Sequence, residues 1–139
     1  MAHTKQKLLL AISAGFALLW ADIALGHVSA GLKHPAMWLP LLLLAPAAVV
    51  CGLTAVQATP ARQRLLSLVC YLAVLMGGLG VVFHLLRFLR DLRGAIQWEV
   101  VLRLMRYPPL FAPLGVTGLG IFGLLARDVP PEGPTTGGN

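Results

Sequence analysis

Long apolar stretches separated by short polar connections dominate the chain. Three stretches contain no formally charged residue: 37–56, 65–86 and 107–126. Each approaches the roughly 20 residues that an α-helix needs to cross the hydrocarbon core of a bilayer. The pattern therefore predicts transmembrane helices over about 37–57, 65–88 and 107–126.

The first apolar segment, about 8–28, differs from the others because it contains an acid, Asp22. We read it as a further transmembrane helix whose carboxylate faces the bundle interior or a polar cavity, since lipid exposure costs about 2.5–3.5 kcal/mol on insertion scales. A cleaved signal peptide is the alternative, because Lys5 and Lys7 precede the apolar run and 24–26 offers small residues for cleavage. The apolar run continues past that site, which favours an uncleaved helix.

Four such segments predict an all-α fold, an integral membrane four-helix bundle in a single domain over residues 1–128. Between the third and fourth helices, apolar residues of 87–106 recur at the spacing of one helix face. This connection is either a short interfacial helix or an extension of the third helix into water. The tail, 129–139, is rich in Pro, Gly and Thr and is predicted to be disordered.

Composition supports the membrane class: 58% of the residues are hydrophobic and 12% are charged, against about 25% charged in soluble domains. The net charge of +6 is spread over helix ends, which favours contact with the headgroups of a lipid bilayer over nucleic acid. Lys and Arg are divided almost evenly between the two sides. Tight basic flanks favour a multi-pass topology with both termini in the cytoplasm.

The common enzyme signatures are missing from the sequence. We find no Gly-rich phosphate loop, Cys-x-x-Cys, His-Glu-x-x-His or Gly-x-Ser-x-Gly pattern. Cys51 and Cys70 both fall inside predicted spans, where free cysteine behaves as a small apolar residue. These observations favour a protein without catalytic activity.

Glycines recur along two of the predicted helices, where they can serve helix packing. Small residues let helix backbones approach closely, either inside the bundle or against a partner chain. The candidate packing positions are Gly77, Gly80, Gly115, Gly118, Gly120 and Gly123.

Polar residues concentrate on one predicted side of the membrane. The first and third helices run in the same direction and end at the same interface, so His27 and His84 can meet there. Arg87 shares a helix face with His84. We take these three as candidate cofactor-binding residues. The rest of the polar cluster comprises Asp22, His34, Arg90 and Asp91.

This cluster has more than one interpretation. Asp22 can pair with an arginine while water solvates the histidines at the interface. Two imidazoles from facing helices can instead hold the iron of haem b. A quinone or a lipid headgroup would use the same residues as a polar anchor.

Three stretches resemble those of a family of small four-helix bacterial inner-membrane proteins: Pro35-Ala36-Met37-Trp38, Phe83-His84 and 108–114, which reads Pro-Pro-Leu-Phe-Ala-Pro-Leu. The resemblance covers most of the chain and implies the four-helix fold without implying a reaction. The segment 93–106 departs from the Gly-rich connection of that family.

Three functions remain open at this stage. The first is a non-catalytic accessory or structural subunit that packs against a membrane partner or a second copy. The second is a redox or ligand-binding membrane anchor that uses His27, His84 and the arginines. The third is a proton or ion carrier, because Asp22 is the one acid clearly inside a predicted span.

Overall fold

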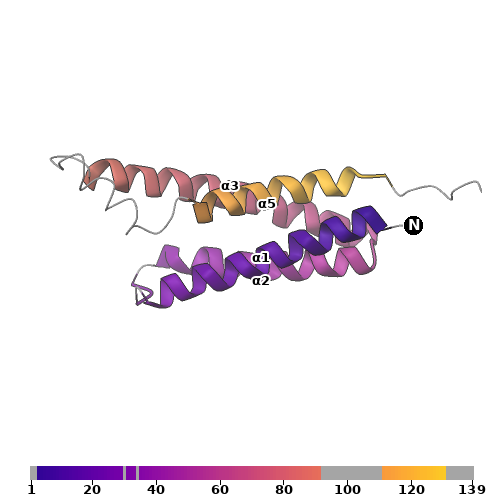
Figure 1. The fold of residues 1–139 in the computed structure, drawn as a ribbon, viewed down its shortest axis with the longest axis horizontal. Helices are drawn as coiled ribbons and strands as arrows, with labels where there is room; N and C mark the ends of the chain where they lie inside the picture. The colour runs from indigo at the N-terminus through magenta and orange to yellow at the C-terminus, as the bar shows by residue number, and fades with distance from the viewer. Residues whose placement is uncertain (1–2, 30, 34, 92–110, 131–139) are drawn as a thin grey trace, which may run out of the picture.

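The computed structural model describes residues 3–29, 31–33, 35–91 and 111–130. These residues form four α-helices and one short 3₁₀ turn (Figure 1). The elements are α1 (His3–Ser29), η1 (Pro35–Met37), α2 (Trp38–Val56), α3 (Pro60–Asp91) and α5 (Phe111–Asp128). The prediction of an all-α four-helix bundle is confirmed. The predicted interfacial helix and most of the predicted disordered tail lie outside the described residues.

The bundle consists of two tight helix pairs. α1 lies along α2, and α3 lies along α5; α2 then packs on α3, and α1 packs on α5. α1 and α3 are therefore diagonal to each other and run in the same direction. One end of the bundle gathers the ends of α1 and α3, and the other gathers their beginnings (Figure 1).

Three helices, α1, α2 and α3, are long and apolar enough to cross a membrane. The 18-residue α5 is not among them, because as described it starts at Phe111 and ends on Arg127 and Asp128. At 1.5 Å per residue it spans about 27 Å, close to the hydrocarbon thickness of about 30 Å. Large apolar side chains on the outer faces, such as Leu18 at 73% exposure and Phe83 at 69%, are suited to contact with lipid. The chain is a membrane protein, and a fourth span stays a prediction.

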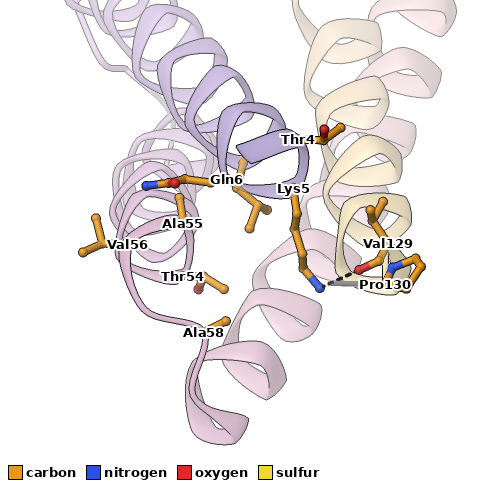
Figure 2. A pocket seen from close by; sticks show the side chains of 10 residues that line it. Thr4, Lys5, Gln6, Thr54, Ala55, Val56, Ala58, Val129 and Pro130 are labelled. Carbon is orange, nitrogen blue, oxygen red and sulfur yellow. Dashed lines mark hydrogen bonds between the residues drawn. The ribbon is translucent and has the colours of Figure 1, made fainter. Parts of the chain in front are cut away.

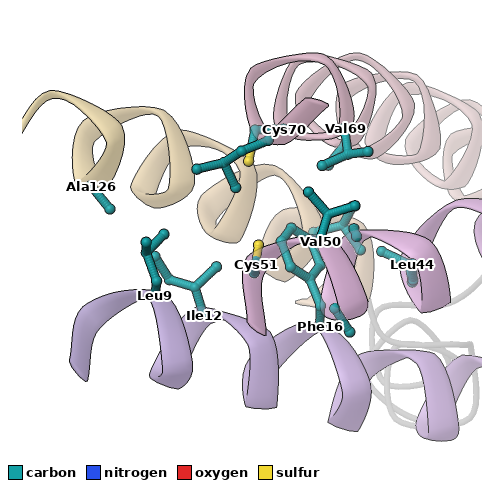
Figure 3. Close-up of a cluster of buried hydrophobic side chains, with 14 of the residues drawn as sticks. Leu9, Ile12, Phe16, Leu44, Val50, Cys51, Val69, Cys70 and Ala126 are labelled. Carbon is teal, nitrogen blue, oxygen red and sulfur yellow. The ribbon is translucent and has the colours of Figure 1, made fainter. Parts of the chain in front are cut away.

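The core lies where the two helix pairs meet, and all four helices contribute to it (Figure 3). Its largest fully buried side chains include Phe16, Leu44, Leu66 and Val116. Because α1 supplies part of this core, removing it as a signal peptide would expose the bundle interior. The uncleaved α1 stays a prediction.

Two side chains of α1 also bind the backbone of α2. The Ser13 hydroxyl donates to the Ala48 carbonyl at 2.7 Å, and the Trp20 indole N–H donates to the Leu41 carbonyl at 3.1 Å. Such hydrogen bonds across helices contribute about 0.6–2 kcal/mol each in membrane bundles. They fix the register of α1 against α2.

Glycines set the close approach of α3 to α5. A Cβ at Gly77 would lie 2.7 Å from the Pro113 carbonyl oxygen, and one at Gly120 would lie 2.8 Å from the Cys70 carbonyl oxygen. Of the other predicted packing glycines, three contact a neighbouring helix: Gly80, Gly115 and Gly123. Gly118 contacts none of the residues that the structure describes. Five of the six therefore pack inside the bundle.

Candidate functional site

The end of the bundle where α1 and α3 finish carries His27, His84 and Arg87, which we call the His84 end. α1 stops there in a Schellman motif: Gly31, at φ +81°, donates to the Val28 carbonyl, and Leu32 donates to the His27 carbonyl at 3.0 Å. This motif holds His27 in the last turn of α1. His84 lies about two turns before the end of α3, and Arg87 follows one turn later.

The three predicted site residues all lie at this end of the bundle. The charges of His27 and Arg87 act on the His84 imidazole. Both imidazoles are partly buried, whereas Arg87 is exposed. Two imidazoles and a planar guanidinium are suited to bind a carboxylate or a phosphate through several N–H donors.

The remaining cluster residues do not all join this group. Asp22 is exposed on α1, so it does not face the bundle interior; a polar cavity, the other environment expected for it, stays a prediction. The inward stripe of α1 runs through Phe16 and Ile23, and Asp22 is rotated about 100° away from Ile23. Arg90 is exposed at the end of α3, and Asp91 is the last residue of that helix. His34 lies outside the described residues.

On the face of α3 towards α5, Pro113 and Thr117 fill the space beside Gly77, and Pro113 also lies beside Gly80. The haem interpretation of His27 and His84 stays a prediction. Within the described ranges, no group of three or more His, Cys, Asp or Glu side chains is arranged to hold a metal ion.

The opposite end of the bundle contains a polar network that the sequence analysis missed. The Lys5 ammonium donates to the Arg127 carbonyl at 2.6 Å. It also donates to the Val129 carbonyl at 3.1 Å (Figure 2). Arg127 in turn donates to the Ser67 hydroxyl at 3.0 Å and pairs with Asp128 at 2.8 Å. The network joins α1, α3 and α5. We call this end of the bundle the Lys5 end.

The cations of the Lys5 end serve as helix caps. Lys5 meets the terminal carbonyls of α5, where the helix dipole favours positive charge. Arg62 donates to the Leu53 and Gln57 carbonyls, both at 3.1 Å, and so closes the end of α2. Thr59 accepts from the Arg62 amide at 3.3 Å and caps the start of α3. Lys5 and Arg127 are far apart in sequence, so no local sequence pattern predicts their contact.

A pocket of about 240 Å³ opens beside Lys5 (Figure 2). Its lining is mostly apolar and comes from the start of α1, the end of α2 and the residues after α5, including Leu9, Ala55 and Val129. The Lys5 ammonium points towards the Val129 carbonyl, which it binds. Because this cation already has two carbonyl partners, the pocket offers mainly an apolar surface.

Comparisons with protein-family models, curated proteins and solved structures found no match. The family resemblance based on the motifs at 35–38 and 108–114 stays a prediction.

Proposed function

We propose that this membrane protein is a non-catalytic binding protein that holds an anionic headgroup at the His84 end. The observation that carries the proposal is that His27, His84 and Arg87 lie at one end of the bundle, near enough for the charges of His27 and Arg87 to act on His84. A phosphate or carboxylate accepts hydrogen bonds from imidazole N–H groups and from a guanidinium, so one such anion can bind all three side chains.

The chemistry of these side chains fits the headgroup of an anionic lipid. Arg87 can give two parallel hydrogen bonds to a phosphate, where a lysine would offer a point charge. The neighbouring outer surface carries exposed apolar side chains such as Phe83 and Leu86, which suit the acyl chains of the same ligand. The site lies where a transmembrane bundle meets the headgroup layer.

Native mass spectrometry in neutral detergent tests this function. Phosphatidylglycerol should remain bound to the full chain, whereas phosphatidylcholine should dissociate. Substituting Arg87→Lys or His84→Gln should weaken phosphatidylglycerol binding about tenfold, as expected for about 1.4 kcal/mol of lost hydrogen bonding to a charged group. Competition by inorganic phosphate would identify the phosphate alone, without its acyl chains, as the ligand.

Arg64 provides the matched control, because it is an exposed arginine on the same helix at the opposite end. Arg64→Lys should leave the affinity unchanged. Equal losses in Arg64→Lys and Arg87→Lys would mean that lipid binds by charge alone at either end, and the proposed site would then be abandoned.

A second candidate function, an accessory subunit for a membrane partner, is supported by two glycines on the outside of the α3–α5 pair. Among the residues that the structure describes, a Cβ at Gly78 or at Gly118 would meet nothing within 4 Å. Gly78 follows Gly77 on α3, and Gly118 follows Thr117 on α5; Gly77 and Thr117 belong to the α3–α5 contact. In two antiparallel helices that face each other, the residue after each contact residue points to the same side of the pair. Small residues on one side of a helix pair suit close approach by a partner helix.

Substituting Gly118→Leu should abolish co-purification with such a partner from a bacterial inner membrane while the bundle keeps its helical content. Retention of every co-purifying protein by Gly118→Leu and by Gly78→Leu would remove the accessory role.

A further inference from the structure

The pocket at the Lys5 end has a buried floor and an open mouth. Leu9 of α1 and Thr54 of α2 line it, and both are only 1% exposed. Thr4 in the first turn of α1 and Pro130 after α5 also line it and are exposed (Figure 2). The pocket therefore leads from the surface of this end of the bundle to the beginning of its core.

The volume of the pocket limits what it can hold. The pocket measures about 240 Å³, whereas an engineered apolar cavity of about 150 Å³ takes one benzene molecule. Pockets for drug-sized ligands begin at about 300 Å³. The pocket at the Lys5 end is therefore suited to one short alkyl chain and is too small for the two chains of a phospholipid.

The inner walls of the pocket suit such a chain. Leu9, Ala55 and Val129 present apolar surface to it, and an alkyl chain placed against them is removed from water. The polar atom of the floor is already satisfied, because the Thr54 hydroxyl donates to the Val50 carbonyl at 2.7 Å. No polar group of the ligand is needed at the inner end.

Lys5 supplies the polar part of the same pocket. An ammonium has three N–H donors, and two carbonyls of the described residues, Arg127 and Val129, accept two of them. The neighbouring acid, Asp128, forms its ion pair with Arg127. The third donor and the positive charge of Lys5 therefore suit an anionic ligand group, and a single donor suits a compact carboxylate.

We propose that this pocket binds a medium-chain fatty acid, with its alkyl chain against Leu9 and Ala55 and its carboxylate on Lys5. The site lies at the opposite end of the bundle from His84 and does not depend on the headgroup proposed there.

The test measures binding of radiolabelled octanoate to the full chain in neutral detergent by equilibrium dialysis, with empty micelles as the blank. One saturable site per chain is expected. Acetate carries the carboxylate without the chain and should not compete. Octyltrimethylammonium carries the chain on a positive group that accepts no hydrogen bond from Lys5, so it should compete at least about tenfold more weakly than unlabelled octanoate.

Variants of three alanines locate the site. Ala55→Leu fills the pocket and should abolish saturable binding. Ala14→Leu makes the same change at an exposed position of α1 outside the pocket and should bind octanoate like the wild type. Because Ala55 also packs against the core, Ala58→Phe at the exposed mouth provides a second obstruction and should weaken binding about tenfold.

Three results would each overturn the proposal. The first is the absence of a saturable site in the wild type. The second is undiminished binding in a folded Ala55→Leu or in Ala58→Phe, because octanoate would then bind outside the pocket. The third is equal competition by octyltrimethylammonium, because the charge of Lys5 would then not select a carboxylate.

Discussion

The two ends of the bundle use positive charge in different ways. At the Lys5 end, Lys5 and Arg62 bind the carbonyls that terminate α5 and α2. At the His84 end, three basic side chains, His27, His84 and Arg87, lie near one another. Cations that cap helices stabilise the fold, whereas several N–H donors at one place are suited to bind an anion. The comparison separates a structural end from a candidate binding end.

An all-or-none measurement tests whether the two ends lie on opposite sides of a membrane. With single cysteines in a Cys51→Ala, Cys70→Ala background, His34→Cys and Arg93→Cys should be labelled from one side, and Thr59→Cys and Pro130→Cys from the other. The reason is that helices that cross the membrane alternate in direction. Labelling of His34→Cys and Thr59→Cys from the same side would contradict the four-span topology and remove the comparison.

The next largest effect should come from the α3–α5 contact that supports the His84 end. Gly77→Ala places a methyl group 2.7 Å from the Pro113 carbonyl oxygen and the Thr117 amide nitrogen, and backbone atoms there cannot rotate away. We expect a loss of about 2–3 kcal/mol in the free energy of unfolding, measured by denaturant titration in mixed micelles. The neighbouring Gly78→Ala, which meets open space, should stay within about 0.5 kcal/mol of the wild type or gain stability. Equal losses would show that α5 does not pack on α3 as described.

The helical pattern was predictable from sequence because transmembrane helices are read from one-dimensional hydropathy. The contacts between helices were harder to predict from the sequence. Glycine spacing predicted close packing but not which glycine would remain open, since Gly118 and Gly120 differ only in the side of α5 they occupy. Asp22 was misplaced because α1 is apolar on every face, so its sequence does not mark the inward side. The Lys5–Arg127 contact joins the two ends of the chain and has no local signal.

Removing the ammonium of the Lys5 end should destabilise the protein. Lys5→Met keeps the apolar stem but loses both hydrogen bonds to the end of α5, which should cost about 1.5–3 kcal/mol in the same titration. Lys7→Met is the control, because Lys7 is exposed, and it should change the free energy by no more than about 0.5 kcal/mol. If Lys5→Met were as stable as Lys7→Met, the hydrogen bonds of Lys5 would not stabilise the fold, and the Lys5 end would not be a structural end.

The corresponding change at the His84 end should leave stability nearly unaltered. His84→Gln removes a basic group that lies near two others, so we expect a change within about 0.5 kcal/mol in lipid-free detergent. The same variant should lose the stabilisation that phosphatidylglycerol gives the wild type, since a ligand stabilises only the state it binds. A large loss of stability without lipid would instead mark His84 as part of the folded framework.

The smallest effect concerns Asp128, the acid of the Lys5 end. The hydrogen bond from Arg127, aided by its charge, lowers the pKa of Asp128 below the ordinary value, which is about 3.9. Because the folded pKa is the lower one, the contribution to stability is complete above the ordinary pKa and is lost as the pH falls through the folded pKa. Both side chains are accessible to water and salt screens the pair, so the effect should be smaller than any of those above. Thermal unfolding of the wild type and Asp128→Asn between about pH 6 and pH 3 should show curves that differ at the upper end and converge at the lower. Two curves separated by the same amount throughout would mean that the Arg127–Asp128 pair contributes nothing that depends on the charge of the carboxylate.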